Sequence, residues 1–351
     1  MANNNIELIT KYSTEAWDEV YKAEAISSLF DAPSAQVKWT GAKTVKIAKF
    51  QATGLGNYYR NNGTSEYDLT GTHLGYAGGQ VGLTWEEFTV KQDRSAKYPI
   101  ELFDDEETNG LILGAATKEI SRTIMVPEVD AYCFSTVYDY AAKQTTTTAS
   151  AADTNAMGLL NDGLLYLEEH EIPAEKQVIV VAPRFMKSLR ATSMELSRLL
   201  QADYNKDVKF TMTKFEGRDL VVCPPNRFRT NIQLKNDGYA WAEDSKHIAF
   251  MIINKDAINH VVKYNKVKII SGDLNLAGQG FDGSTLFARI YHDVFVTDNK
   301  RYSIYAATYS DYTTAINTPE IMGAPVVETL PAVAKDASKT AKGARVDGDE
   351  A

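Results

Sequence analysis

The stretch FDDEETNGLILGAATKEISRTIMVPEVDAYCFSTVYDYAAKQ, residues 103–144, organises the rest of the chain. Its apolar residues recur at steps of three or four, which keeps them on one side of an α-helix: Leu113, Ala116, Ile120, Ile124, Pro127, Ala131, Phe134, Tyr138 and Ala141. Asp104, with Glu107 three residues later, marks the expected helix start, where negative charge is favoured. The pattern predicts one amphipathic helix of roughly 55–60 Å, kinked at Pro127 and laid across a sheet.

Length and composition limit what the chain can be. With 351 residues it exceeds what one core usually organises, so two compact units with extensions are expected. A formal charge of -9 argues against a protein that coats duplex DNA tightly, but leaves room for weak contact. Cys133 and Cys223 have neither metal-ligand spacing nor the pattern of a disulfide scaffold, which fits a reducing compartment.

Targeting signals are not evident in the sequence. The first twenty residues, MANNNIELITKYSTEAWDEV, lack a basic patch followed by an apolar core. Uncharged apolar runs do not approach the roughly 18 residues that cross a bilayer. We therefore expect a soluble protein made in a cytoplasm and without a membrane partner.

The chain before the long helix contains two features that suggest extensions. Residues 6–30 carry a thin apolar stripe, which fits equally an arm lying on another surface or an N-terminal helix of the main domain. Residues 37–50 and 83–90 have strand character and enclose about thirty residues rich in Gly, Asn, Thr and Tyr. This predicts a long two-stranded ribbon, whose candidate assembly contacts are of residue types enriched at protein interfaces: Tyr58, Tyr59 and Arg60.

The chain after the long helix alternates helices and strands. Residues 144–153, with four consecutive threonines, are expected to form a loop. An α/β unit should follow, with one helix spanning residues 157–167, a buried strand at 177–182, a helix opened by Pro183 and a hairpin turning at residues 216–217. Later segments predict further strands, a glycine-rich loop and a flexible tail: 248–253, 261–270, 286–296 and 302–309 as strands, 271–284 as the loop, and 317–351 as the tail.

Catalytic motifs are weak. Gly278–Gly283 fits G-x-G-x-x-G, but the following residues predict a strand, whereas a dinucleotide site needs a helix there. The five histidines are scattered without metal-ligand spacing. Acidic pairs such as Glu86–Glu87 are better explained as solvated charge. We predict no catalytic residue, no cofactor and no metal.

The order of these elements resembles the major capsid protein of tailed bacteriophages, the Hong Kong 97-like fold, of the type found in phages of Gram-positive hosts. The resemblance spans about residues 5–310 and rests on an ordered set of stretches: NIELITKYSTEAWDEVYKAE, TWEEFTVKQDRSAKYPIELFDDEET, VPEVDAYCFSTVYDYA, VVAPRFMKSLRAT and ARIYHDVFVTDNKRYSIYAA. It implies an α+β fold with an N-terminal arm, an extended β-ribbon loop, a peripheral domain with a long spine helix, and an α/β axial domain.

Carried onto this sequence, the resemblance implies seven regions. They are an arm at 1–40, an extended loop at 41–98, a peripheral domain with the spine helix at 99–152, an axial domain at 153–260, returning peripheral strands and their loop at 261–300, a closing axial strand at 301–316 and a flexible tail at 317–351. Within the returning strands, the loop 271–284 would meet neighbouring subunits, which adds two assembly contacts: Gln279 and Phe281.

The implied function is structural. The chain would self-assemble, as pentamers and hexamers, into the icosahedral head that encloses the double-stranded DNA of a tailed phage. The implied partners are portal, scaffolding and decoration proteins and weakly bound DNA, and the implied locations are the virion and, during assembly, the host cytoplasm. Two alternatives stay open: an encapsulin-like shell around a protein cargo, and, more remotely, an enzyme built on the strand at 177–182 and the helix after Pro183.

Overall fold

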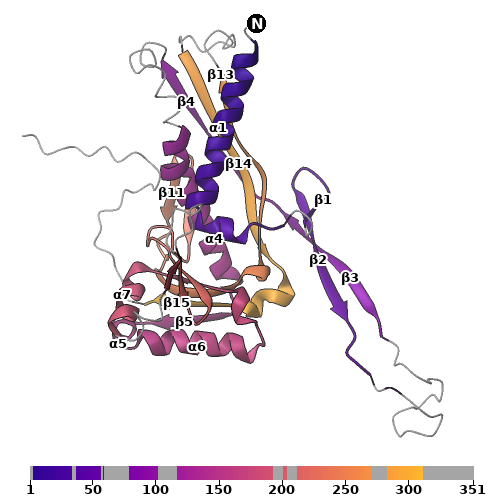
Figure 1. Ribbon diagram of the computed structural model, residues 1–351, viewed down its shortest axis with the longest axis vertical. Helices are drawn as coiled ribbons and strands as arrows, with labels where there is room; N and C mark the ends of the chain where they lie inside the picture. Colours follow the sequence, from indigo (N-terminus) through magenta and orange to yellow (C-terminus); the bar gives the residue numbers. More distant parts are fainter. Residues whose placement is uncertain are drawn as a thin grey trace, which may run out of the picture.

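The structure is a computed structural model that describes residues 3–33, 37–56, 58, 79–101, 117–192, 201–203, 212–270 and 283–310. It has the predicted α+β composition. An elongated body holds two sheets and most of the helices, and a narrow ribbon projects from one side of it (Figure 1). The predicted residues Tyr59, Arg60, Gln279 and Phe281, the helix start at Asp104 and the tail 317–351 lie outside the described residues.

A seven-stranded sheet forms the wider end of the body. Its strand order is β5-β15-β12-β6-β9-β8-β7, with parallel pairs at β15–β5 and β6–β9 and antiparallel pairs elsewhere. The strands are β5 (Lys143–Thr147), β6 (Gln177–Val181), β7 (Gln201–Asp203), β8 (Met212–Phe215), β9 (Arg218–Val222), β12 (Ile248–Asn254) and β15 (Ile304–Tyr309). The β8–β9 hairpin turns at Glu216 and Gly217, both with positive φ, as the sequence predicts.

Both faces of this sheet are buried, which explains the uninterrupted apolar run of β6. On one face, alternate residues such as Ile179 and Ile252 pack under the helices α5 (Ala149–Thr154), α6 (Ala156–Glu169) and α7 (Pro183–Thr192). On the other face, Val180 and Met251 pack against Phe134 of α4 (Val126–Tyr140) and against the 3₁₀ turn η1 (Ile26–Phe30). The predicted helices at 157–167 and after Pro183 and the predicted strand at 177–182 are confirmed.

A three-stranded antiparallel sheet forms the narrow end. Its order is β13-β14-β4, with β4 (Gln92–Glu101), β13 (Ile258–Ile270) and β14 (Gly283–Val296). Helix α1 (Asn3–Glu24) lies along it (Figure 1). Trp17 and Tyr21 of α1 and Val129 of α4 are buried against alternate residues of β13 and β14. Of the two readings of the N-terminal segment, the structure thus favours a helix packed on the main body.

The long helix is confirmed over its described part. Residues 117–120 are helical, a π-helical turn η2 (Ser121–Met125) follows, and α4 continues to Tyr140. The π turn lies just before Pro127. Proline has no N–H and carries a bulky ring, and the wider turn accommodates both. Ala131 and Phe134 of the predicted stripe are fully buried. The helix therefore contributes to the cores of both sheets, as expected of a helix laid across a sheet.

Two predictions about the regions beside this helix are wrong. Residues 144–153 are not a loop: β5 pairs in parallel with β15, and α5 begins after Thr148, whose side-chain oxygen accepts a hydrogen bond from the Ala151 amide. Threonine is a good strand former, so Thr145–Thr147 of the four-threonine run enter the sheet as part of β5. The helix ends at Tyr140 and not at Gln144.

The remaining described elements are short or peripheral. The ribbon consists of β1 (Val37–Trp39), β2 (Thr44–Ala52) and β3 (Val81–Thr89), paired in that order. A separate hairpin of β10 (Ile232–Lys235) and β11 (Gly238–Trp241) packs on Ala131 of α4. Three further 3₁₀ turns complete the described chain: η3 (Ala174–Lys176), η4 (Lys255–Ala257) and η6 (Asp298–Ser303). Gly283 begins β14, so the glycine-rich motif leads into a strand as predicted.

Candidate assembly surfaces

The ribbon has two faces of different chemistry. Strands β2 and β3 pair antiparallel with Ile47 opposite Glu86 and Phe50 opposite Leu83. Side chains of directly paired residues lie on the same side, and the side alternates along each strand. We call one side the inner ribbon face (Val45, Ile47, Lys49, Thr84, Glu86 and Phe88) and the other the outer ribbon face (Ala48, Phe50, Ala52, Val81, Leu83 and Trp85).

The inner ribbon face is fixed to the body at its base. Val45 and Ile47 are buried with Phe88, whose ring stacks on Phe295 of β14 at 4.8 Å between centroids. Further out, Lys49 Nζ lies 3.0 Å from Glu86 Oε1. The other Glu86 oxygen accepts a hydrogen bond of 3.4 Å from the amide of Asp298. These contacts set the direction in which the ribbon leaves the body.

The outer ribbon face presents large apolar side chains to solvent. The exposed fractions are 72% for Phe50, 82% for Val81, 48% for Leu83 and 43% for Trp85. They stand together because Phe50 pairs with Leu83, and Trp85 and Val81 are two residues away on either side. Exposed apolar residues gathered on one surface mark an interaction site more often than scattered ones do. A thin ribbon has no second layer of its own to cover them.

Of the five predicted assembly contacts, Tyr58 alone is described. It lies beyond β2 with 56% of its surface exposed, close in sequence to the fully exposed Leu55. The other four lie outside the described residues. The outer ribbon face was missed, because the alternation of residues 48–52 and 81–85 shows two strands but not their register.

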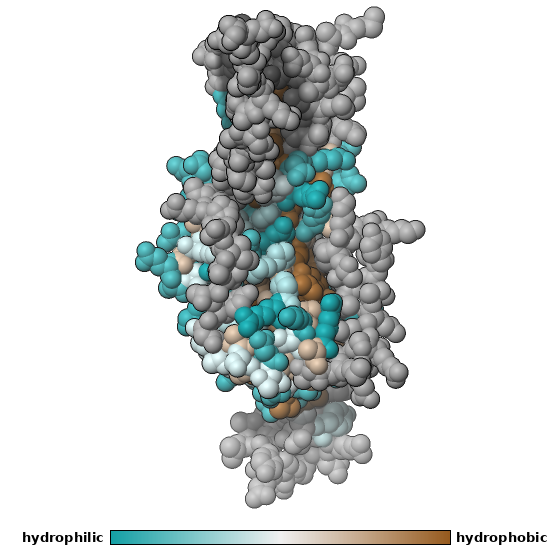
Figure 2. Space-filling view, turned by 90° about the vertical axis from the view of Figure 1, so that its left-hand side faces the viewer, coloured by the Kyte–Doolittle hydropathy of each residue, from teal (hydrophilic) through white to brown (hydrophobic). Residues whose placement is uncertain are grey.

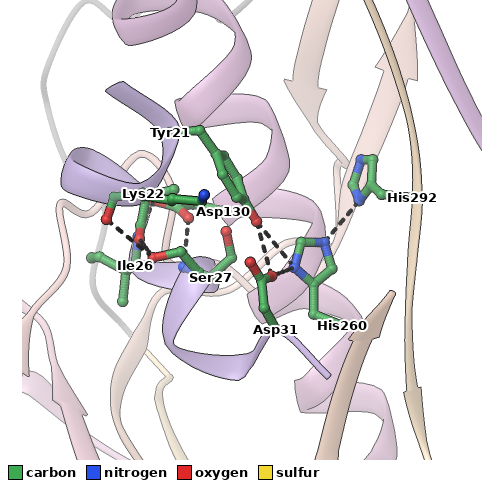
Figure 3. Close-up of polar contacts among 10 residues, drawn as sticks. Tyr21, Lys22, Ile26, Ser27, Asp31, Asp130, His260 and His292 are labelled. Carbon is green, nitrogen blue, oxygen red and sulfur yellow. Dashed lines mark hydrogen bonds and ion pairs between the residues drawn. The ribbon is translucent and has the colours of Figure 1, made fainter. Parts of the chain in front are cut away.

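A buried polar network holds the N-terminal segment to the three-stranded sheet (Figure 3). Asp31, just after η1, accepts hydrogen bonds from Tyr21 Oη (3.1 Å) and from the Nδ1 of His260 on β13 (2.7 Å). His260 Nε2 is 3.1 Å from Nδ1 of His292 on β14. Burial and the adjacent His260 hold the pKa of His292 well below its usual value, so this ring stays neutral.

A second carboxylate, which unlike Asp31 is buried, holds the same segment to α4. Asp130 is fully buried, and its side chain accepts hydrogen bonds from the amides of Ile26 (3.3 Å) and Ser27 (2.9 Å). Arg227 Nη1 lies 3.2 Å from Asp130 Oδ2. Both networks join residues that are far apart in the sequence, and the sequence carries no signal that pairs them. Their role is to fix the N-terminal segment.

A histidine and an arginine with shifted pKa values flank the β10–β11 hairpin in the sequence and form an isolated β-bridge. Arg229 Nη2 is 2.6 Å from Nε2 of His247, and the guanidinium stacks on Trp241 at 3.5 Å from the ring centroid. Burial, with the Arg229 charge second, lowers the pKa of His247 to about 4. Burial lowers the pKa of Arg229 to about 10. His247 is therefore neutral and Arg229 charged at neutral pH.

A cavity of about 530 Å³ lies between the long helix and the sheet strands β4 and β14. Apolar side chains such as Ile124 and Ile290 line it, and Arg94 and Glu128 pair at its wall. The face turned away from the ribbon is mainly hydrophilic, with a narrow band of hydrophobic residues running along it (Figure 2). The cavity belongs to the narrow end and not to the α/β unit, where the enzyme alternative would place its site.

Among the described residues, groups of three or more His, Cys, Asp or Glu side chains that could hold a metal ion do not occur. Within the same ranges, no helix combines the length and the apolarity that spanning a membrane would require.

Comparison with known proteins identifies relatives by structure alone. Neither a family model nor a curated protein matches the sequence. A structure from Gordonia phage Cozz matches at 13% identity with a TM-score of 0.52, covering 82% of this chain and 86% of that one. One from Mycobacterium phage Ogopogo matches at 10% identity and 0.51, covering 82% and 93%. The capsid structure of the cyanophage P-SCSP1u matches at 13% identity and 0.49, covering 83% and 87%.

At such identities the likeness concerns the fold, and the matches to Cozz and Ogopogo carry it. The chain has the α+β fold of tailed-phage capsid structures, the Hong Kong 97-like fold. The resemblance stated from the sequence is thus confirmed at the level of fold.

Proposed function

We propose that this chain is the major capsid protein of a tailed bacteriophage. Copies of it assemble, as pentamers and hexamers, into an icosahedral head around double-stranded DNA, and the chain has no catalytic activity. The observation that carries the proposal is the outer ribbon face on this fold: a projecting ribbon whose apolar side chains, Phe50 and Trp85 among them, lack cover within the described chain. A second copy supplies that cover.

The domain assignment follows the same proposal. Residues 1–40 form an N-terminal arm that lies on its own subunit through α1. Residues 41–98 form the extended loop, 99–152 with 261–300 the peripheral domain, 153–260 with 301–316 the axial domain, and 317–351 a tail. Some of these limits fall within elements, since β4 spans residues 98 and 99 and β13 spans residues 260 and 261. Strand β13 therefore joins the axial and peripheral domains, and β4 joins the extended loop to the peripheral domain.

The partners and locations of the mature protein follow from this role. A portal protein would occupy one vertex, scaffolding and decoration proteins would act during or after assembly, and DNA would touch the shell weakly because the chain is acidic. The protein would assemble in the host cytoplasm and remain in the virion. Tyr58, Tyr59, Arg60, Gln279 and Phe281 are proposed to contact neighbouring subunits.

Deletion of residues 54–79 tests the proposal. It removes the ribbon end beyond the paired strands, so the subunit should keep its circular dichroism spectrum and thermal transition. Particle formation, followed by light scattering and electron microscopy, should be lost. Normal particles from the deletion variant would refute a role of residues 54–79 in assembly. Wild-type particles that contain a co-purifying protein and no nucleic acid would instead favour an encapsulin-like shell.

A further inference from the structure

The ribbon base covers one end of the second face of the three-stranded sheet, where it buries Tyr291 and Phe295. The rows of Phe287 and Arg289 on that face lie outside this cover. Helices α1 and α4 bury the other face, which carries Val267, Leu286 and Ile290. On β4 the burial alternates strictly from Lys91 to Ile100, so every second residue of this edge strand is exposed. A three-stranded sheet with helices on one face only presents the opposite face to solvent or to a partner.

The register of the strands gathers basic and aromatic side chains on this second face. Lys268, Phe287 and Lys97 form one row across the three strands. The next two rows are Lys266, Arg289 and Ser95, and then Tyr264, Tyr291 and Asp93. We call this set the basic sheet face. Lys97, Lys266, Lys268 and Arg289 are all exposed.

Contacts within the basic sheet face order its cations over its rings. Lys97 Nζ lies 5.8 Å from the centre of the Phe287 ring, and Lys266 Nζ and Arg289 Cζ lie 5.8 and 5.7 Å from that of Tyr264. Arg289 also pairs with Asp93 at 2.6 Å. Cations held over aromatic rings form a preorganised surface, because the side chains need less ordering when a partner binds.

This surface contrasts with the charge of the chain as a whole, which is -9. Four cations gathered in two rows, against the single acid Asp93 in the third, leave the remainder of each copy more acidic still. The basic sheet face is therefore complementary to the rest of a second copy and repelled by the same face of that copy. A contact between two unlike surfaces is heterologous, and heterologous contacts close into rings when the rotation permits.

We propose that the basic sheet face binds an acidic surface of a second copy of this chain and so helps to close capsomer rings. The inference rests on the proposed function. Aromatic residues and arginine are enriched where proteins meet, which favours a protein partner. Duplex DNA would use the cations but would leave Phe287 and Tyr264 without a role.

The test compares two triple variants with the same change of charge. K97Q/K266Q/K268Q neutralises the basic sheet face, and K118Q/K143Q/K187Q neutralises three exposed lysines on other elements. Raising NaCl from about 50 to 500 mM should slow wild-type and control assembly about tenfold, as expected for contacts screened by salt. The face variant should assemble about tenfold more slowly at low salt and respond little to added salt. Light scattering and negative-stain images measure both.

The other outcomes separate this inference from the proposed function. Equal assembly of the face variant and the control would overturn the inference alone. A second result would also overturn the inference: wild type binds duplex DNA of about 20 base pairs, the face variant does not, and both assemble equally. The face would then be assigned to nucleic acid. If wild type forms no particles, the shell function fails. Sedimentation velocity then decides: salt-sensitive association absent from the face variant supports the inference, and no association overturns it.

Discussion

Asp130 connects three parts of the chain through one buried carboxylate. It accepts hydrogen bonds from the amides of Ile26 and Ser27 and forms an ion pair with Arg227. Its own side chain has no access to solvent. A buried charge is tolerated where hydrogen bonds and an opposite charge replace the lost water. The N-terminal segment therefore has its position fixed by a residue of α4, far away in the sequence.

Asp130→Ala should lower the free energy of unfolding of the subunit by about 3–5 kcal/mol, because it leaves Arg227 and two buried amides without their acceptor. Urea unfolding followed by tryptophan fluorescence measures this. The exposed Asp162 offers a matched control, and Asp162→Ala should change the value by less than about 0.5 kcal/mol. A loss of similar size in both variants would show that Asp130 is not a structural anchor.

His247 should make folding sensitive to mild acid. Burial lowers its pKa to about 4, so the folded chain binds this proton more weakly than the unfolded chain, whose histidines titrate near about 6.5. The contribution of His247 to stability is fully present above the pKa of the unfolded chain. It is lost as the pH falls through that value toward about 4. His292, whose pKa is also depressed, adds a loss of the same sign.

His247→Asn should accordingly reduce the fall of the melting temperature between pH 6.5 and about 4. Thermal unfolding at closely spaced pH values gives the profile. His170→Asn, at an exposed position, serves as the control and should retain the wild-type profile. Identical profiles for wild type and His247→Asn would mean that this residue does not contribute to the acid sensitivity.

At the scale of elements, the ribbon shows two opposite uses of apolar residues on one strand. Ile47 is 3% exposed and belongs to the core at the ribbon base, whereas Phe50, three residues later, is 72% exposed. An odd number of residues separates them, so they lie on opposite faces of β2. The apolar side of the ribbon thus changes from the inner to the outer face between its base and its far end.

Ile47→Ala and Phe50→Ser should separate folding from assembly. Ile47→Ala leaves a cavity in the core at the ribbon base and should cost about 2–5 kcal/mol of stability. Phe50→Ser removes an exposed ring, so subunit stability should change by less than about 0.5 kcal/mol while particle formation falls sharply. Urea unfolding and electron microscopy measure the two effects. Normal particle yield from Phe50→Ser would remove the outer ribbon face from the assembly contacts.

The sequence predicts best the elements whose pattern is local. The stripe from Ile120 to Tyr138, the buried run of β6 and the Glu216–Gly217 turn each carry their own period or turn signal, and each is confirmed. Strand β4 was not predicted, because it alternates polar residues with few apolar ones and contains Pro99, which only an edge strand tolerates. Strand β5 was missed because its threonines become strand residues only beside β15.

The candidate surfaces could be predicted only in part, for a related reason. The ribbon and its tyrosines come from one continuous stretch of sequence, so they could be predicted from it. The basic sheet face depends on the register among three strands that are far apart in the chain, so Lys97 and Lys268 cannot be related from sequence alone. The pairing of Asp31 with His260 likewise exists only after α1 packs on β13. Register and packing are tertiary properties, and no local pattern contains them.

At the scale of the whole molecule, α4 makes the two sheets one cooperative body. Its Val129 belongs to the core beside the three-stranded sheet, and its Phe134 to the core beside the seven-stranded sheet. Unfolding either sheet exposes part of the same helix, so the two should open together. The far end of the ribbon has no such connection, since its strands pair with each other and its outer face meets no core.

Hydrogen exchange should therefore divide the molecule into two parts. In the free subunit, amides near Gln51 and Leu83 should exchange at least about 100-fold faster than those of β12, because the paired ribbon strands open without exposing a core. In assembled particles, protection of these ribbon amides should rise at least about tenfold, since a neighbouring copy covers the outer ribbon face, while β12 should change little. Mass spectrometry of peptides from both samples measures this, with β12 as the internal reference. Ribbon amides that exchange at the same rate in subunits and particles would place the intersubunit contacts elsewhere and leave the apolar outer face without an explanation.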